Sequence, residues 1–266
     1  MTQVIAPARH SERFLQFFGW YSCRLLRKRF ASVRFADGSD AIIRNAADSD
    51  RPVVIAMNHP SWWDPIIGVT IKHLYMRKRS AISPVDMAMY KRFGFMKRLG
   101  LFGIDLDHPN ATSAMLEYVR GCVDVNPDLA LFITPQGEFC DVRTPVVVRP
   151  GIAAVAQSLR DPTVLSLAIE IAFWHDQRPE LLLRAEHCDQ PAHPTTTGWV
   201  RTIRETMHHN TDRLAKLSVA RDSEAMTPVL ARNGSSVNPA FDLWQRARGR
   251  SATVSPRNEN NTEASP

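Results

Sequence analysis

The fold is decided by residues 52–64, which read Pro-Val-Val-Ile-Ala-Met-Asn-His-Pro-Ser-Trp-Trp-Asp. The first six residues form a short apolar run with β-branched side chains, which is typical of a strand buried on both faces of a sheet. Pro60 and Ser61 follow soon after, and both residue types are common where helices begin. The stretch therefore predicts a buried strand, a turn and a helix over residues 62–74.

Similar apolar runs recur along the chain and alternate with helical patterns. They predict buried strands at residues 130–134, 164–171 and 180–185, with shorter strands near 80–83 and 101–106. Helices are expected at residues 86–99, 111–123, 152–159 and 195–216. Strands that alternate with helices favour a single α/β domain, with a largely buried mixed sheet flanked by helices.

Composition divides the chain into three parts. Residues 1–35 predict an N-terminal amphipathic, membrane-associating helical segment, and residues 36–246 predict the α/β domain. Residues 247–266 are rich in Arg, Ser, Asn and Pro, and a segment of this composition cannot bury enough apolar surface to fold. We therefore expect a disordered tail there.

The N-terminal helical segment, residues 11–30, has two interpretations. It is either a core-packing helix with a solvated basic end at residues 24–29, or an interfacial helix that docks on an anionic membrane. Many of its aromatic positions are adjacent, so they cannot all face one core. Its apolar side chains are Phe14, Leu15, Phe17, Phe18, Trp20, Tyr21, Leu25 and Leu26.

Composition also narrows the partners. The formal net charge is +6, which attracts nucleic acid, anionic lipid or an acidic carrier such as coenzyme A. The four cysteines are widely spaced and form no Cys-x-x-Cys pair, which argues against a metal knuckle or a dense disulfide framework. The sequence shows no signal-peptide pattern and no uncharged apolar run of about 18 residues, so we expect a cytoplasmic protein.

His59 and Asp64 carry the strongest chemical signal. If His59 lies in the turn after the strand and Asp64 lies one turn into the helix, the carboxylate can hold one imidazole nitrogen. The other nitrogen is then free to take a proton from an alcohol, as a general base does. Asp64 would also stabilise the imidazolium that forms, so this pair is the predicted catalytic centre.

With these residues the chain resembles the glycerolipid acyltransferase family, which includes the lysophosphatidate acyltransferases and has a His-x4-Asp motif. Asn58, His59 and Asp64 match the family's first motif. Residues 100–105 resemble the second motif, residues 132–138 resemble the Phe-Pro-Glu-Gly-Thr block, and 149–151 resemble its basic-residue-then-Gly step. Residues 164–169 resemble the fourth block but lack its central Pro. The resemblance covers residues 51–171 and implies an acyltransferase fold with His59 as base.

The departures from the family's motifs concern the acceptor. The family's second block continues to an Arg that is expected to bind the acceptor's phosphate, and this position is Leu106 here. Leu cannot replace the planar, permanent charge of Arg, although Arg143 or Arg149 could supply one from elsewhere. We therefore expect an acceptor other than simple lysophosphatidic acid: a glycolipid, a glycosylated isoprenoid or another hydroxylated lipid.

The resemblance also implies a set of substrate-binding residues: Asn58, Pro135, Gln136, Gly137, Glu138 and Arg149. Gln136 stands where the family has Glu, and Glu138 stands in place of its Thr. A second interpretation treats 135–137 only as a turn that closes a buried strand. Backbone N–H groups near Gly137 are a candidate oxyanion hole.

The predicted reaction is transfer of a fatty acyl group from acyl-coenzyme A or acyl-carrier protein to a lysophospholipid, glycolipid or similar lipid hydroxyl. No cofactor, metal or nucleic acid is expected, since His175-Asp176 and His208-His209 lack a second ligand cluster. The protein is expected at the inner face of the membrane, in peripheral contact with anionic lipid. Two alternatives remain open: a hydrolase that activates water with the same pair, and a catalytically inactive lipid-binding homologue.

Overall fold

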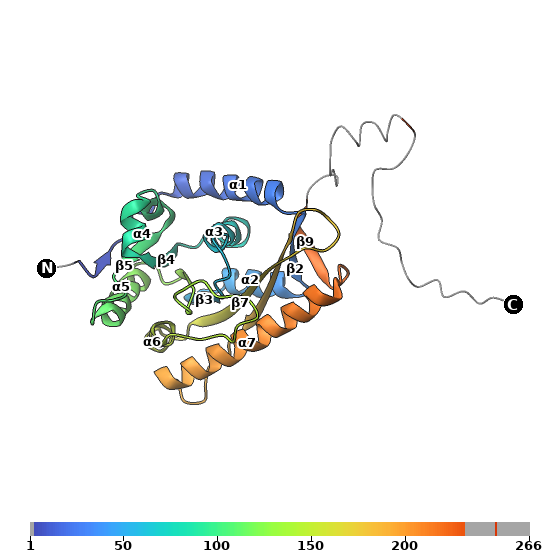
Figure 1. Cartoon of the computed structure of the whole chain (residues 1–266). Coiled ribbons are helices and arrows are strands. Elements are labelled where there is room, and N and C mark those ends of the chain that lie inside the picture. The colour runs from blue at the N-terminus through green and yellow to red at the C-terminus, as the bar shows by residue number, and fades with distance from the viewer. Residues whose placement is uncertain (1–2, 232–247, 249–266) are drawn as a thin grey trace.

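The computed structural model describes residues 3–231 and Arg248 (Figure 1). Within this part of the chain, nine strands form one sheet in the order β1-β5-β4-β6-β3-β7-β8-β2-β9. The sheet is mixed, because β7–β8, β1–β5 and β2–β9 are antiparallel and the other neighbours are parallel. The α/β class and the mixed, helix-flanked sheet are therefore confirmed. The tail predicted at 247–266 lies outside the described residues, apart from Arg248.

The centre of the sheet consists of three parallel strands: β3 (Val53–Met57), β6 (Ala130–Ile133) and β7 (Thr163–Ala172). Val53 is in register with Ala130 on one side and Thr163 on the other. Because the three strands run in the same direction, their carboxyl ends meet at one edge of the sheet. The segments after β3 and β6, which carry the first and third motifs, are therefore neighbours.

Helices cover both faces of these strands, and the alternation along β3 shows which helix lies on which face (Figure 1). Val53, Ile55 and Met57 pack with α1 (Glu12–Arg29), α2 (Ser39–Asp48) and α3 (Asp64–Tyr75). Val54 and Ala56 pack with α5 (Ala111–Val125), α6 (Pro150–Ser158) and α7 (Thr196–Ala220). A strand covered on both faces has to be apolar throughout, as residues 53–57 are.

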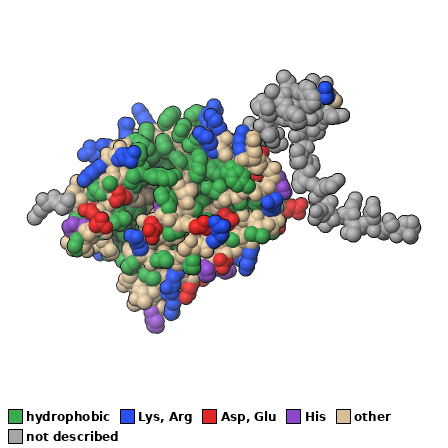
Figure 2. All heavy atoms as spheres, in the orientation of Figure 1, with side chains coloured by type: hydrophobic (Ala, Val, Ile, Leu, Met, Phe, Trp, Pro, Cys, Tyr) green, Lys and Arg blue, Asp and Glu red, His purple; other side chains and the backbone are tan. Residues whose placement is uncertain are grey.

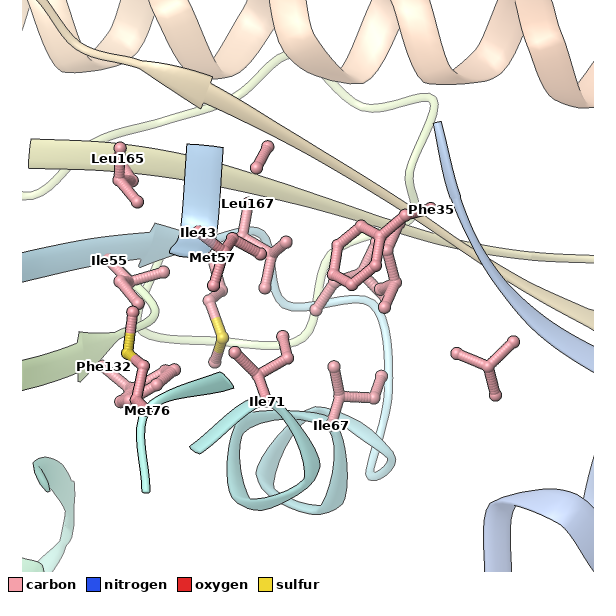
Figure 3. Packing of buried hydrophobic residues seen from close by; sticks show 14 of the residues in the cluster. Phe35, Ile43, Ile55, Met57, Ile67, Ile71, Met76, Phe132, Leu165 and Leu167 are labelled. Carbon is pink, nitrogen blue, oxygen red and sulfur yellow. The ribbon is translucent and has the colours of Figure 1, made fainter. Parts of the chain in front are cut away.

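The packing of α3 on the sheet fixes the helix that carries the predicted carboxylate. Ile67 and Ile71, one turn apart, point from α3 towards Ile55 and Met57 of β3 (Figure 3). Both isoleucines are 2% exposed or less, and burying each contributes about 1.5–3 kcal/mol to folding. The start of α3 is thereby held at the carboxyl edge of the sheet.

The remaining elements extend the sheet on both sides. On one side lie β4 (Ala81–Asp86), α4 (Met87–Arg92), the 3-10 helix η1 (Met96–Leu99), β5 (Leu101–Ile104) and β1 (Ile5–Ala6). On the other lie β8 (Glu180–His187), β2 (Ser32–Ala36) and β9 (Met226–Ala231). The helix predicted at 86–99 is divided into α4 and η1.

The N-terminal segment is part of this architecture at both of its ends. β1 pairs with β5 before α1 begins, and β2 pairs with β8 and β9 after α1 ends. The boundary predicted between residues 35 and 36 falls inside β2. Helix α1 is thus anchored to the sheet from both sides. Among the residues that the structure describes, no helix is both long and apolar enough to cross a bilayer.

A buried arginine joins elements at the opposite, amino edge of the sheet. Arg79 is 2% exposed, and its guanidinium donates to the carbonyl oxygens of Ala47 (2.9 Å), Arg51 (2.9 Å) and Asp128 (2.6 Å). The Ala47 carbonyl lies in the last turn of α2, and those of Arg51 and Asp128 precede β3 and β6. One permanent cation therefore satisfies several buried acceptors that the strand ends leave unpaired.

Candidate active site

Asn58 fixes the exit of β3. Its amide nitrogen donates to the Ile169 carbonyl at 2.9 Å, and its amide oxygen accepts from the Ile169 N–H at 2.7 Å. Both groups of the 4% exposed side chain are thus used by the backbone of β7. Asn58 was predicted to bind substrate, but here it ties the strand that leads into His59 to its neighbour.

His59 and Asp64 form the predicted pair. Nδ1 of His59 lies 2.7 Å from Oδ2 of Asp64, and the carboxylate is 1% exposed. Ser61 donates to the same carboxylate from its N–H (3.2 Å) and its hydroxyl (3.4 Å). Asp64 is the first residue of α3, instead of lying one turn into it, because residues 61–63 form a turn before the helix begins.

Burial and hydrogen bonding act in opposite directions on Asp64. Burial raises the pKa of its carboxyl, while the hydrogen bonds from His59 and Ser61 lower this pKa in part, and burial dominates. The ionised carboxylate of Asp64 is therefore less favourable in the folded state than in the unfolded chain. Asp64 orients the imidazole through Nδ1, which leaves Nε2 as the nitrogen available for proton transfer.

The segment 135–140 holds His59 from outside the first motif. The His59 N–H donates to Oε1 of Gln136 at 3.0 Å, and the His59 carbonyl accepts from the Cys140 N–H at 2.9 Å. Phe139 stacks on the imidazole with ring centroids 4.3 Å apart and planes 29° from parallel. Neither Phe139 nor Cys140 was predicted as a site residue, and their only signal in the sequence is their position directly after the third motif.

Gly137 occupies a position that requires glycine. Its φ is +75°, and a Cβ there would lie 2.7 Å from the guanidinium carbon of Arg149. Its N–H donates to the Thr134 carbonyl at 3.1 Å, which closes the turn after β6. The turn itself therefore uses this donor, and an oxyanion hole formed by other backbone N–H groups near Gly137 stays a prediction.

The imidazole opens onto a largely apolar cavity of about 470 Å³. Its walls come from both helical layers, from the strands β4 to β6 and from α1, which contributes Leu15. A volume of this size is typical of sites that enclose a small organic ligand. Its apolar walls include Val69, Ile82, Leu99, Leu101, Ile104, Met115 and Phe132.

Comparison with known proteins identifies the fold. No protein-family model and no curated protein matches this sequence. Among solved structures, the chain is similar to the crystal structure of the 1-acyl-sn-glycerophosphate (LPA) acyltransferase PlsC from Thermotoga maritima. The TM-score is 0.51, the alignment covers 76% of this chain and 79% of that chain, and 14% of the residues are identical.

The protein has a glycerolipid acyltransferase fold. The fold implied by the sequence resemblance is thus confirmed. At 14% identity the likeness concerns the fold alone, since one fold can carry different chemistries. What the protein does has to be argued from its own site.

In this glycerolipid acyltransferase fold, part of the predicted site lines the cavity and part supports it. His59, Asp64, Pro135, Gly137 and Arg149 line the cavity. Asn58, Gln136 and Glu138 are not among its lining residues. Gln136 is buried against the His59 backbone, so its contact is with the segment that carries His59 and not with the cavity.

The two candidate cations that follow the third motif, Arg143 and Arg149, have different surroundings. Arg149 lines the cavity beside Gly137, and no ion pair engages it within residues 3–231. Arg143 is bound to Asp141 by two hydrogen bonds of 2.8 and 2.7 Å at the surface. Leu106 lines the cavity and is 47% exposed at its edge. Arg149 is therefore the residue that can bring a positive charge to this opening.

The two pairs considered as metal ligands, His175-Asp176 and His208-His209, are not among the residues that line the cavity. His209 contacts Glu186 at 2.8 Å, and His208 faces Asp212 at 3.7 Å. In the part of the chain that the structure describes, no group of three or more His, Cys, Asp or Glu side chains is placed to hold a metal ion.

Proposed function

We propose that the protein is an acyltransferase that moves a fatty acyl group from acyl-coenzyme A or acyl-carrier protein to a hydroxyl of a lipid acceptor. One observation carries the proposal: the His59–Asp64 pair opens onto a large apolar cavity. An acid–base pair beside an apolar cavity suits a substrate that joins a reactive carbonyl to a long hydrocarbon chain. The fold shared with a lysophosphatidate acyltransferase agrees with this chemistry.

In the proposed reaction His59 acts as general base. Nδ1 is held by Asp64, so Nε2 takes the proton of the acceptor hydroxyl while its oxygen bonds to the thioester carbonyl carbon. The carbon–sulfur bond then breaks, and the thiolate leaves and receives the proton from the imidazolium. The products are an ester and a free thiol, and no covalent acyl-enzyme is formed.

The cavity provides the binding energy for the acyl chain. Each methylene that leaves water for an apolar wall contributes about 0.8 kcal/mol. Two of the charged side chains on the walls are engaged by the protein itself: the Lys72 amine donates to the Arg77 carbonyl at 3.0 Å, and Asp86 caps α4. The other polar residues on the walls, away from His59, Asp64 and Arg149, are Ser83, Thr112 and Thr134. A chain inserted there meets hydrocarbon over most of its length, with its carbonyl at His59.

The opening of the cavity favours an acceptor with little charge. Leu106 lies where a phosphate-binding Arg is expected, and Arg149 is the cation that remains at the edge. A single guanidinium can bind one anionic group, and coenzyme A or a carrier protein already brings phosphate. We therefore favour a glycolipid or another hydroxylated lipid over simple lysophosphatidic acid.

Helix α1 is the proposed membrane contact. Its inner face buries Leu15, Gly19, Cys23 and Leu26, while its outer face exposes aromatic residues. Phe17, Trp20 and Tyr21 are 59%, 56% and 42% exposed, and basic residues end the helix. Figure 2 shows hydrophobic side chains gathered over α1 with Lys and Arg beside them. Exposed aromatics beside cations are typical of a helix that lies on an anionic membrane. In this proposal α1 lies on the inner face of the membrane.

The test uses purified wild type and His59→Ala with labelled acyl-coenzyme A and a total membrane lipid extract. Labelled lipid formed by wild type alone is the expected result, and the product identifies the acceptor. Labelled free fatty acid alone would identify a hydrolase. If neither protein moves the label, acyl-carrier protein replaces coenzyme A as the donor. A second failure would leave the inactive lipid-binding homologue.

A further inference from the structure

An exposed aromatic ring stacks on the imidazole of His59, and a second exposed ring contacts the first. Phe139 stacks on the imidazole at 4.3 Å, and the Trp62 ring lies 5.4 Å from the Phe139 ring. Both rings line the cavity, yet Phe139 is 47% exposed and Trp62 is 63% exposed. Neither ring belongs to the core, so packing does not explain why large apolar side chains stand in solvent here.

The position of Phe139 is fixed by contacts on both sides of it. Gln136 binds the His59 N–H, and the Cys140 N–H binds the His59 carbonyl, so the segment is attached to His59 before and after the ring. The His59 side chain is 20% exposed with the Phe139 ring stacked on it, so this ring is part of what shields the imidazole from solvent. The arrangement places one aromatic ring against the base and a second ring against the first.

We propose that Phe139, supported by Trp62, is a positioning residue that keeps water from His59 and so directs the acyl group to the acceptor hydroxyl. This inference rests on the proposed acyl transfer. Water at Nε2 would lose a proton to His59, bond to the thioester carbonyl carbon and release a free fatty acid and a thiol. A lipid hydroxyl follows the same steps to an ester. The rings disfavour the first course because excluding water suppresses hydrolysis of reactive acyl groups.

The two rings favour a lipid acceptor over water because only the lipid has apolar surface to bury against them. An amphiphile buries its own apolar surface against Phe139 and Trp62 as it approaches, and this burial favours its binding. Water gains nothing from that surface. The same two rings therefore disfavour the small nucleophile and favour the large one.

The experiment measures the ratio of labelled free fatty acid to labelled ester for wild type, Phe139→Ala, Phe139→Trp and Phe173→Ala, at saturating donor and acceptor. Phe173 is a matched control, because it is 63% exposed and lies outside the cavity. We expect Phe139→Ala to raise the ratio about tenfold, which corresponds to roughly 1.4 kcal/mol between the two barriers. Phe139→Trp and Phe173→Ala should keep the wild-type ratio.

Thermal denaturation of each variant separates this effect from unfolding, which would lower both products together and leave their ratio unchanged. An unchanged ratio in Phe139→Ala, with a raised KM for the donor, would make Phe139 an acyl-chain contact and overturn the inference. In that case the proposed function would still stand, provided that wild type forms the ester and His59→Ala does not. A wild type that releases only free fatty acid would overturn both.

Discussion

Gln136 accepts the backbone N–H of His59 at 3.0 Å across 77 residues of sequence. The contact joins the turn after β6 to the turn after β3 and holds the backbone of His59 itself. Gln136 is 5% exposed, so no water can replace its amide oxygen without rearrangement. The backbone of His59, the proposed base, is therefore held by a residue that follows another strand.

This contact predicts the effect of Gln136→Leu. The substitution leaves the buried His59 N–H unpaired, which costs about 1–3 kcal/mol of stability. Because the base is displaced, we expect kcat to fall about tenfold or more. Urea denaturation and steady-state kinetics measure the two effects. Gln157→Leu, at an exposed position on α6, serves as the control. Wild-type kcat in Gln136→Leu would show that the hydrogen bond does not position His59.

Asp64→Asn should separate activity from stability. The variant loses the carboxylate that orients and charge-stabilises His59, so we expect kcat to fall about a hundredfold or more. The folded pKa of Asp64 is raised above its ordinary value of 3.8. Such a group contributes stability that is present below the ordinary pKa and lost as pH rises through the folded pKa.

At pH 7 the wild type therefore carries the cost of a buried carboxylate that Asp64→Asn removes. We expect the variant to be at least as stable as wild type at pH 7, and its advantage to shrink as pH falls below about 4. Denaturation at both pH values measures this, with the exposed Asp107→Asn as control. The predicted direction would be wrong if the stability of Asp64→Asn, measured relative to wild type, were lower at pH 7 than at pH 4.

The two arginines after the third motif should differ in function. Arg149→Ala removes the cation at the cavity edge, and we expect the KM of the phosphorylated donor to rise about tenfold, as for loss of a charged hydrogen bond. Arg143→Ala should leave KM near wild type, because Arg143 is paired with Asp141 at the surface. Equal effects of the two substitutions would mean that the charge acts at long range.

Two glycine substitutions should change the free energy of unfolding in opposite directions. Gly137→Ala meets a positive φ and the Arg149 guanidinium, so we expect a loss of about 1–3 kcal/mol. Gly121→Ala lies within α5 with no atom within 4 Å of the added Cβ, and a gain of about 0.5–1 kcal/mol is expected there. The free energy of unfolding of each variant is measured in urea. Stabilisation by Gly137→Ala would rule out the turn geometry described above.

The membrane contact is tested on the outer face of α1. Phe17→Ala with Trp20→Ala removes two exposed aromatics, and we expect binding to vesicles containing anionic phospholipid to weaken about tenfold or more. Co-sedimentation with the vesicles measures the binding, and Phe173→Ala is the control. Added salt should weaken wild-type binding as well, because the cations of α1 are exposed. Unchanged sedimentation of the double variant would exclude α1 as the contact.

The sequence by itself determined the local part of this protein. The apolar run of β3, the turn and the start of α3 are contiguous, so their pattern predicts both the central strand and the His59–Asp64 pair. Strands β1, β2 and β9 and helix α2 were not predicted. In β2, for example, Arg34 interrupts the apolar pattern and is accommodated only because Glu180 of β8 lies 3.3 Å away.

The tertiary structure decided what each motif residue contacts. It assigned Asn58 to the backbone of β7, closed the Gly137 N–H into a turn and brought Gln136, Phe139 and Cys140 to His59. Apart from the Gly137 turn, these contacts join segments far apart in the chain, and they exist because β3 pairs in parallel with both β6 and β7. A local pattern records the propensity of its own segment, whereas the partner of a loop side chain depends on which strands are neighbours.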